Sequence, residues 1–468
     1  MTVTIVGSQL GDEGKGALVD RYGGEADVVV RYQGGDNAGH TVVEDGEEYA
    51  LSLVPSGAIR GKVGVLGNGC VVNPRTLFSE LDDLRERGLE PDVRVARRAH
   101  VVFPYHRRLD GIEEEAKAES DQEIGTTGRG IGPTYEDKAA RRGIRVADLL
   151  DPEVLREKLE YTVERTTAVI ENVYELDAGE ECDVDALHEE YADYGRRFRE
   201  EGMTVACGPF LAERRAAGDN VVFEGAQGTC IDIDHGNYPY VTSSNPTAGG
   251  ATVGTGLGPT VVGDGEVVGV VKAYLSRVGS GPMPTELDSD GAGHTTGDEP
   301  GQATGNETDQ PTGDDTDAAI AAEIRDRGGE FGTVTGRPRR IGWLDLPILR
   351  HAARVNGFTG IAVNHLDVLA GLDKLAVGHA YELDGERVET LPATTETWAR
   401  CEPILKEFDP WPDVDWDAVA AEGYDALPES ARVYLAYLES ELDTEVYTVG
   451  VGPDREQTIE RVDPWNRV

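Results

Sequence analysis

The chain has 468 residues, of which 88 are acidic and 44 basic, so its formal net charge at pH 7 is −44. It lacks the basic surface that nucleic-acid binding requires, and we exclude nucleic acid as an expected partner. It contains no run of 18 apolar residues, and no basic segment precedes its first apolar stretch, so we expect a cytoplasmic protein without a membrane span or signal peptide.

The predicted elements alternate along the chain. Short runs rich in β-branched residues are typical of buried strands, and longer stretches with apolar residues at helical spacing are typical of amphipathic helices. We expect strands at 3–6, 27–31, 63–66, 93–95, 221–224, 267–271, 360–363 and 446–449, and helices at 74–87, 151–175, 184–201, 316–327 and 428–442. This alternation predicts an α/β fold with a large, mostly parallel central sheet flanked by helices. We treat residues 1–468 as a single domain.

Residues 289–317 differ in composition from the rest of the chain. They are almost entirely Gly, Thr, Asp, Glu, Gln and Pro, which cannot bury enough apolar surface to offset the entropy of ordering. We expect a solvated, disordered insertion there. A lid over the site is the alternative, because the segment leads into the basic loop at 335–340.

The acidic composition indicates a salty environment. Only eight of the basic residues are lysines. Charges of one sign repel one another in dilute buffer, whereas in molar salt the Debye length falls to about 3 Å and the repulsion is screened. We therefore expect a high-salt cytoplasm.

The five cysteines are widely spaced and contain no C-x-x-C pair. This pattern argues against a disulfide framework or a zinc ribbon. We expect all five to be buried, small apolar side chains.

The segment from Gly7 to Gly16 directly follows the first predicted strand and is rich in glycine. A glycine turn from a strand into a helix directs backbone N–H groups at an anion, so the segment predicts a phosphate-binding loop. It is two residues longer than an ordinary P-loop, and Gly16 stands where that pattern has Ser or Thr after Lys15. It also contains Asp12, an acid expected to serve as a metal ligand or a proton acceptor. A glycine turn without such a role is the alternative.

The second predicted strand runs into a glycine-rich loop that contains His40. Histidine can donate or accept a proton near neutral pH, although a histidine in a glycine loop is often structural. Because ligands bind at the carboxyl ends of parallel strands, we expect the loops that carry Asp12 and His40 to meet at one edge of the sheet.

Three further segments carry polar or basic side chains. Residues 125–133 supply hydroxyls, N–H groups and Arg129, which suit phosphate binding, with a mobile loop as the alternative. Residues 223–229, followed by 232–236 and 240–245, suit a ribose phosphate or a base edge. Residues 333–340 contain three arginines that suit carboxylates or phosphates, with a dimer contact or surface ion pairs as the alternative.

Taken in order, these motifs resemble the adenylosuccinate synthetase family. The resemblance rests on GDEGKG, YQGGDNAGHT, GTTGRGIGPTYEDKAARRG, FEGAQGTCIDIDHGNYPYVTSSN, KAYLSRVGSGPMPTEL, TGRPRRIGW and GVGPDR. It covers nearly the whole chain and implies a P-loop-related α/β fold in a homodimer. It implies GTP-dependent joining of L-aspartate to IMP with Mg²⁺, giving adenylosuccinate, GDP and phosphate by way of 6-phosphoryl-IMP.

The resemblance also implies roles for individual residues. Asp12 would be the general base at the purine N1, His40 the general acid, and Gln227 a third catalytic residue. Asp12 and the carbonyl of Gly39 would bind Mg²⁺. GTP would be bound by Gly11, Glu13, Gly14, Lys15, Gly16, Gly39, Thr41, His365, Asp367, Gly450 and Gly452. IMP would be bound by Asp12, Lys15, Asn37, Ala38, Thr127, Gln227, Thr242, Arg337 and, from the neighbouring subunit, Arg141. Aspartate would be bound by Thr333, Val334, Thr335, Arg337 and Arg339.

The sequence departs from the family pattern at three places. His365 stands where many members have a lysine beside the guanine, Ala17 replaces a common lysine, and Pro338 interrupts the arginine run. His365 leaves open how strictly GTP is preferred over ATP. Two other activities stay open as well: a different phosphoryl-transferring ligase or kinase, and a GTP-binding switch without synthetic activity.

Overall fold

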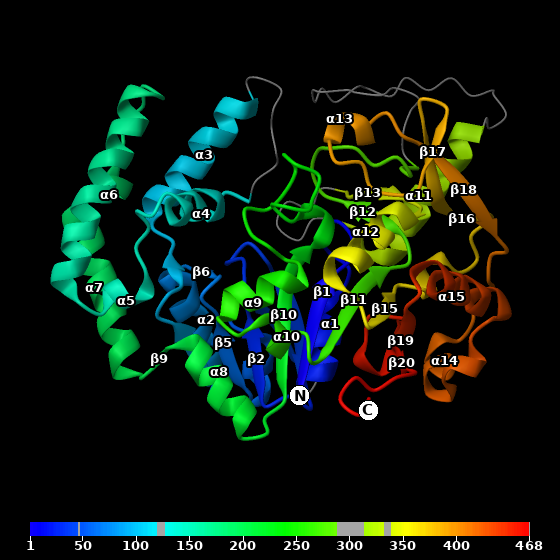
Figure 1. The fold of residues 1–468 in the computed structure, drawn as a ribbon, viewed down its shortest axis with the longest axis horizontal. Coiled ribbons are helices and arrows are strands. Elements are labelled where there is room, and N and C mark those ends of the chain that lie inside the picture. Colours follow the sequence, from blue (N-terminus) through cyan, green and yellow to red (C-terminus); the bar gives the residue numbers. More distant parts are fainter. Residues whose placement is uncertain (45–46, 119–126, 288–312, 332–337, 468) are drawn as a thin grey trace.

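The computed structural model describes residues 1–44, 47–118, 127–287, 313–331 and 338–467. Its central feature is a ten-stranded sheet near the middle of the molecule (Figure 1). The strands run parallel to their neighbours except for β20, which is antiparallel to β19. In spatial order they are β20 (Thr458–Glu460), β19 (Glu445–Gly450), β15 (Gly360–Asn364), β11 (Glu266–Lys272), β1 (Thr2–Gly7), β10 (Val221–Gly228), β2 (Val28–Arg31), β5 (Val63–Leu66), β7 (Val93–Ala96) and β9 (Thr204–Val205).

The eight strands predicted from the sequence all belong to this sheet. Their valine-rich runs are buried on both faces, as expected for a parallel sheet covered by helices. The sequence reading missed β9 and β20, because strands of two and three residues are too short to show a pattern.

The five predicted helices are also confirmed. The longest, α6, ends at Asn172, three residues before the predicted end at 175. It begins with Pro152, and the Asp151 carboxylate caps it by accepting from the N–H groups of Glu153 and Val154. The helices are α1 (Lys15–Gly23), α2 (Pro74–Glu86), α3 (Pro104–Ala118), α4 (Ile131–Ala139), α5 (Val146–Leu149), α6 (Pro152–Asn172), α7 (Val184–Glu200), α8 (Cys207–Ala216), α9 (Ala248–Thr255), α10 (Pro259–Val262), α11 (Gly313–Gly328), α12 (Leu346–Asn356), α13 (Thr395–Trp398), α14 (Trp416–Glu422) and α15 (Glu429–Leu442).

Two large apolar clusters pack against the sheet. One joins β2, β5 and β7 to α2, α6 and α7, and the other joins β11, β15 and β19 to α11, α12 and α15. A third cluster packs α1 against β1 and β10 at the centre. Figure 1 shows α6 and α7 beyond the β9 end of the sheet and β16 to β18 beyond the opposite end.

Four smaller sheets complete the described part of the chain. Three have two strands and one has four. Their strands are β3 (His40–Glu44) with β4 (Glu47–Leu51), β6 (Val71–Val72) with β8 (His100–Val101), β12 (Leu275–Arg277) with β13 (Arg340–Gly342), and β14 (Leu344–Asp345) with β16 (Leu375–Leu383), β17 (Glu386–Val388) and β18 (Glu402–Phe408).

Most of the predicted insertion, residues 289–312, lies outside the described residues. The helix α11 begins at Gly313, so residues 313–315 are helical at the end of the expected insertion, and residues 316–317 belong to the helix expected at 316–327. Acidic residues are favourable in the first turn of a helix, so a run rich in aspartate can begin one.

Two other expectations concern composition. All five cysteines are free thiols; four are buried, and Cys182 is half-buried. Among the described residues, no helix is long and apolar enough to span a membrane.

Candidate active site

The predicted site segments follow neighbouring strands at one edge of the sheet. The strands β19, β15, β11, β1, β10 and β2 lie side by side and parallel, so their carboxyl ends share this edge. The loops that leave them carry the residues that the motifs singled out, which is where α/β folds bind ligands.

The phosphate loop after β1 is held from inside by Glu13. This side chain is fully buried, and its Oε1 accepts from the backbone N–H groups of Gln9 and Gly11, both at 3.0 Å. Its Oε2 accepts from Nζ of Lys15 at 2.6 Å. The carboxylate of Glu13 therefore braces the loop, and a side chain at Gly7 or Gly228 would overlap it.

The helix that follows this loop begins without a side-chain cap. Gly14 is the N-cap residue of α1, with φ of 82°, and as a glycine it has no side chain to accept from the first N–H groups of the helix. These N–H groups and Lys15 together form an anion-binding arrangement of the kind that holds nucleotide phosphates.

Backbone strain is concentrated at predicted site residues. Seven described non-glycine residues have positive φ, and four of them are predicted to act at the site: Asp12 (57°), Arg141 (63°), Gln227 (59°) and His365 (62°). Left-handed backbone costs energy for such residues and collects at functional sites. The pattern supports a functional role for these four positions.

Three predicted ligand-binding residues carry buried oxygens that lack a hydrogen-bond partner among the described residues. They are Oε1 of Gln227, Oγ1 of Thr242 and Oδ1 of Asp367. An unsatisfied buried polar atom is costly, and a bound ligand is one way of satisfying it. Burial also raises the pKa of Asp367.

The loops after β2 and β10 and the start of α4 come together. A Cβ atom on Gly34 would lie 3.3 Å from Oε1 of Gln227, and one on Gly132 would lie 3.5 Å from Oγ of Ser243. The guanidinium of Arg129 is 3.9 Å from the Asp36 carboxylate. These contacts place three separately predicted segments around one region.

The loop after β15 lies against the phosphate loop. Nδ2 of Asn364 donates to the backbone carbonyl of Glu13 at 2.9 Å, and the amide of Leu366 donates to the carbonyl of Gly450 at 3.1 Å. Burial and the nearby Lys272 charge lower the pKa of His365 to about 4, so its imidazole is neutral at pH 7.

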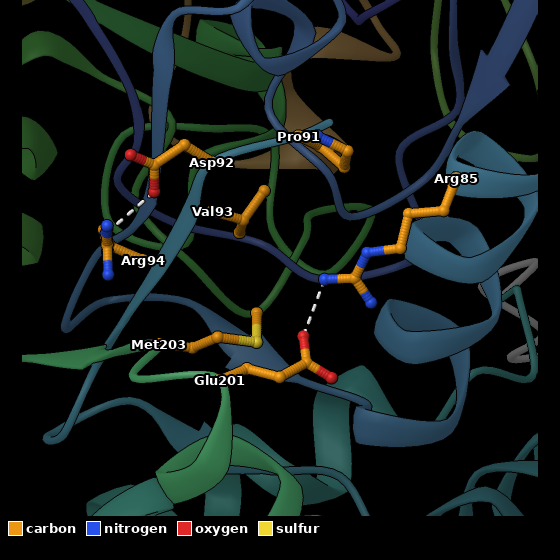
Figure 2. Close-up of a pocket in the computed structure, with 7 residues that line it drawn as sticks. All are labelled: Arg85, Pro91, Asp92, Val93, Arg94, Glu201 and Met203. Carbon is orange, nitrogen blue, oxygen red and sulfur yellow. Dashed lines mark hydrogen bonds and ion pairs between the residues drawn. The ribbon is translucent and has the colours of Figure 1, made fainter. Parts of the chain in front are cut away.

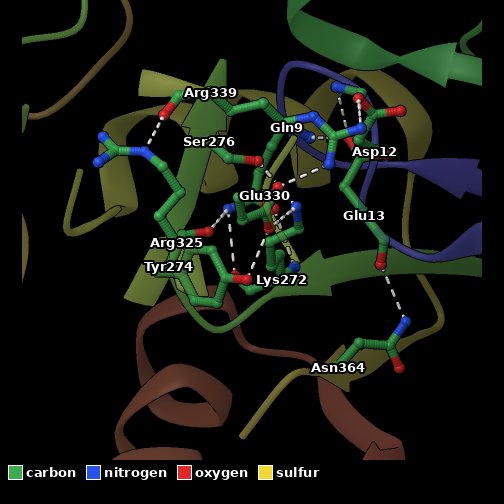
Figure 3. Close-up of polar contacts among 11 residues, drawn as sticks. Gln9, Asp12, Glu13, Lys272, Tyr274, Ser276, Arg325, Glu330, Arg339 and Asn364 are labelled. Atoms are coloured by element: carbon green, nitrogen blue, oxygen red, sulfur yellow. Dashed lines mark hydrogen bonds and ion pairs between the residues drawn. The ribbon is translucent and has the colours of Figure 1, made fainter. Parts of the chain in front are cut away.

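A chain of alternating charges extends from Asp12 into the core, as Figure 3 shows. Arg339 bridges two carboxylates, with NH2 at 2.9 Å from Oδ2 of Asp12 and NH1 at 2.7 Å from Oε2 of Glu330. Oε1 of Glu330 accepts from Nζ of Lys272 and from the hydroxyl of Tyr274, both at 2.6 Å. Burial alone would raise the pKa of Glu330, but the Lys272 charge and these hydrogen bonds outweigh it and lower the pKa to about 2.

Comparison with known proteins identifies the family. The family model for adenylosuccinate synthetase matches residues 4–459. The chain belongs to the adenylosuccinate synthetase family. It is therefore a ligase of purine nucleotide biosynthesis.

Individual relatives match along their whole length. The chain is 67% identical to adenylosuccinate synthetase of Haloarcula marismortui, over 99% of this chain and 100% of that protein. It is 68% identical to the Natronomonas pharaonis protein of the same name, over 98% and 99%. A structure of fully ligated adenylosuccinate synthetase from Plasmodium falciparum matches with a TM-score of 0.84 at 32% identity, covering 98% of this chain and 99% of that one.

Several residues expected from the adenylosuccinate synthetase motifs are not placed. Thr333, Val334, Thr335 and Arg337 lie outside the described residues, as do the side chains of His40 and Thr41. The backbone of His40 begins β3, which lies beside α1. The structure therefore brings the strand that starts at His40 next to the helix that follows the phosphate loop.

Arg141 is exposed at the end of α4, at the opposite end of this helix from Gly130 and the converging loops. Its neighbour Arg142 is bound to Glu136 at 2.7 Å and to Asp137 at 2.5 Å. Within one chain, the helix α4 thus separates Arg141 from the other residues predicted to bind IMP.

One part of the predicted ribose-phosphate segment has a structural role instead. The Asp232 carboxylate accepts from backbone N–H groups of its own loop, at Asp234 and His235, and from the side chains of Asn245 and Thr247. The prediction that 232–236 binds ligand is therefore wrong for Asp232, because this network already uses its oxygens.

Four residues of the site were missed by the sequence reading: Lys272, Tyr274, Glu330 and Asn364. Lys272 and Tyr274 belong to the motif KAYLSRVGSGPMPTEL. A lysine at the end of a buried, valine-rich strand is unusual in a chain with so few lysines, and it could have indicated a role at the site. Nothing in the local sequence of Glu330 or Asn364 distinguishes either one.

The described residues hold no group of three or more His, Cys, Asp or Glu side chains arranged to bind a metal. Mg²⁺ commonly takes one or two protein carboxylates and completes its shell with substrate phosphates and water. A half-exposed Asp12 beside the phosphate loop fits that mode of binding.

Two cavities lie away from the phosphate loop, and the second borders the segment 125–133 at Gly128. Figure 2 shows one of about 320 Å³ at the opposite edge of the sheet, around Val93 at the start of β7. Its arginines are already paired, Arg85 with Glu201 at 2.6 Å and Arg94 with Asp92 at 2.8 Å. The other, of about 620 Å³, lies along α3.

Proposed function

We propose that this chain joins L-aspartate to IMP at the expense of GTP, with Asp12 as the general base. The observation that carries the proposal is the position of Asp12. Asp12 has a left-handed backbone conformation within a phosphate-binding loop. This loop lies beside the loops that carry the unsatisfied oxygens of Gln227 and Thr242. We expect the reaction to take place in a salt-rich cytoplasm.

In the first step the γ-phosphoryl group of GTP passes to the 6-oxygen of IMP. The bond from phosphorus to the GDP oxygen breaks, a bond to the 6-oxygen forms, and Asp12 takes the proton from N1 so that the 6-oxygen becomes nucleophilic. Lys15 and the uncapped N terminus of α1 hold the phosphates. His40 is assigned as the general acid from its motif alone.

In the second step the aspartate amine attacks C6. A carbon–nitrogen bond forms, the bond from C6 to oxygen breaks, and phosphate leaves with the oxygen that IMP brought, while the amine gives up one proton to the leaving phosphate or to solvent. Phosphate is a far better leaving group than a purine oxygen, which is why the first step is needed. Arg339, with the residues expected at 333–337, binds the aspartate carboxylates.

Magnesium fits this arrangement through Asp12 and the carbonyl of Gly39. When bound, it neutralises negative charge on the phosphates of GTP. The buried oxygens of Gln227 and Thr242 have no hydrogen-bond partner among the described residues. They are therefore available to bind IMP.

Guanine recognition is assigned to Asp367. A carboxylate accepts hydrogen bonds from the N1–H and amino group of guanine, which adenine does not offer in that arrangement. The half-buried, neutral ring of His365 lies beside the phosphate loop and is available to pack on the base.

A homodimer is part of the proposal. Arg141 is exposed and lies at the far end of α4 from the converging loops, so it is suited to reach the IMP phosphate of a neighbouring subunit. Each site would then need residues from two chains.

The deciding experiment is a reaction in molar KCl with IMP, L-aspartate and Mg²⁺, comparing GTP with ATP. We expect adenylosuccinate and phosphate to form together with GTP, and phosphate release to require both IMP and aspartate. A switch would hydrolyse GTP without them, and a different kinase or ligase would make no adenylosuccinate. With ¹⁸O at the 6-position of IMP, the label should appear in the released phosphate; label released into water instead would rule out the phosphoryl intermediate.

A further inference from the structure

We propose that Glu330 is a positioning residue of the reaction, which holds Arg339 in place and through it fixes Asp12. The inference rests on the proposed function, because that function assigns roles to Asp12 and Arg339. Glu330 itself contacts none of the substrates in this proposal.

Glu330 is a buried carboxylate whose two oxygens are both used. Its residue is 1% exposed, and the Lys272 residue that pairs with it is 2% exposed. One oxygen accepts from Lys272 and Tyr274, and the other accepts from Arg339. Replacing such a buried ion pair with apolar residues of similar volume is often neutral or stabilising, so this pair is weak evidence for stability. A positioning role gives it a function that apolar residues could not supply.

The NH2 group of Arg339, on the side away from Glu330, faces the carboxylate of Asp12. The planar guanidinium spans the two carboxylates, Glu330 on the buried side and Asp12 on the half-exposed side. Because the fork of a guanidinium is rigid, fixing one end of it sets the direction of the other. Glu330 thus determines where Arg339 presents its second nitrogen to Asp12.

Backbone contacts also pair the described residues on the two sides of positions 332–337. The amide of Arg339 donates to the carbonyl of Glu330 at 2.9 Å, and Phe331 pairs with Pro338 as an antiparallel bridge. The residues expected to bind aspartate lie between these two paired ends. Glu330 therefore contacts Arg339 twice, through its backbone carbonyl and through its carboxylate.

The other end of the chain of contacts is tied to the phosphate loop. Gln9 accepts from the amide of Lys272 at 2.8 Å and donates to the carbonyls of Lys272 and Tyr274 at 3.2 and 3.1 Å. Lys272 is the last residue of β11, which pairs with β1. Its ion pair therefore connects Glu330 to the strand that precedes the phosphate loop. This connection links Glu330, and through it Arg339, to the phosphate loop.

The test compares matched pairs of variants in steady-state kinetics. Glu330→Gln keeps the size of the side chain and removes its charge, and Tyr274→Phe removes only one donor to it. Tyr381→Phe is the control, because the Tyr381 hydroxyl donates to another buried carboxylate, Asp345, whose described contacts do not include Asp12 or Arg339. The melting temperature of each variant is measured alongside.

We expect Glu330→Gln to raise the KM for aspartate about tenfold or more, as for loss of a hydrogen bond to a charged group. Tyr274→Phe should produce a smaller rise, Tyr381→Phe none, and the KM for IMP should change less than about threefold in all of them. Lowered melting temperatures with an unchanged KM for aspartate in both Glu330→Gln and Tyr274→Phe would overturn the inference. If Glu330→Gln does not fold, Tyr274→Phe and its control decide the matter.

A double-mutant cycle separates positioning from general weakening. Arg339→Lys replaces the fork with a single ammonium group, which cannot bridge both carboxylates. In that background, Tyr274→Phe or Glu330→Gln should change kcat/KM for aspartate by less than about threefold, because the group they act through is already gone. Effects that multiply would overturn the inference. A wild-type chain that makes no adenylosuccinate would instead overturn the proposed function, and this inference with it.

Discussion

Nδ2 of Asn364 lies 2.9 Å from the backbone carbonyl oxygen of Glu13, a hydrogen bond between residues 351 positions apart in the chain. It ties the end of β15 to the phosphate loop. We expect Asn364→Ala to lower kcat/KM for GTP about tenfold, because the loop loses the contact that fixes its shape.

Asn220→Ala is the control for that variant, since Asn220 donates in the same way to the carbonyl of Glu25, away from the phosphate loop. Kinetics at varied GTP compare the two. Equal effects would show that the Asn364 contact has no special bearing on GTP.

Asp12→Asn should abolish turnover while leaving the fold intact. The amide keeps the size of the carboxylate but cannot take a proton from the purine N1, so a loss of about 10²-fold or more is expected. Adenylosuccinate formation measures activity, and circular dichroism with the melting temperature verifies folding. Near-normal activity in a folded variant would reject Asp12 as the base.

Arg141 is expected to act across a subunit boundary. Arg141→Leu and Asp12→Asn chains, each inactive alone, should regain activity when mixed, because one site of the hybrid dimer then has both residues intact. The control mixes Asp12→Asn with the Asp12→Asn/Arg141→Leu double variant, in which every site lacks the base. Absence of rescue in verified hybrids would assign the arginine to its own chain.

We expect the free energy of unfolding to decrease as pH rises toward neutrality, because the Asp345 carboxyl keeps its proton in the folded state. Burial raises the pKa of its carboxyl to about 7, although hydrogen bonds from Tyr381 and the Ile348 amide oppose the shift. Between the unfolded pKa of about 3.9 and the folded one, the native state holds a proton that the unfolded state has lost. The stabilisation is thus complete below about pH 4 and is lost as pH rises through 7.

Asp345→Asn removes this titration and keeps a good N-cap for α12. Urea unfolding from pH 5 to 8 should show wild type losing about 1 kcal/mol per pH unit relative to the variant. Parallel curves for the two proteins would mean that Asp345 does not hold the proton.

The net charge of −44 predicts a requirement for salt. We expect the melting temperature and activity to rise from 0.1 M to molar KCl, because screening removes self-repulsion. A triple variant, Glu164→Gln/Glu171→Gln/Glu200→Gln, removes three exposed acids from α6 and α7. It should exceed wild type in stability at low salt, with the difference vanishing in molar salt. Activity that peaks below about 0.1 M would contradict this reading.

The central strands could be read from the sequence because their signal is local. Valine runs such as 267–271 are buried on both faces of the sheet, and the residues themselves carry that information. The loops that follow these strands could also be read, since glycines and a lysine in a short spacing describe a phosphate site without reference to distant residues.

The sequence could not reveal how polar residues pair across the molecule. Glu330 forms an ion pair with Lys272, which is 58 positions away in the chain. The carboxylate of Asp232, which the motif placed among ligand-binding residues, accepts hydrogen bonds from Asn245 and Thr247 instead. Such pairings depend on how loops from separate strands pack, and no periodicity or spacing encodes them.

By itself the sequence determined the family, the parallel sheet, the phosphate loop with Asp12 and the acidic surface, because each depends on residue types within short segments. Only the tertiary structure decided which side chains are buried without partners, which backbone positions are strained, and that Arg339 links Asp12 to Glu330. The physical reason is that burial and hydrogen bonding are properties of surroundings, and the surroundings of each loop come from strands far away in the chain.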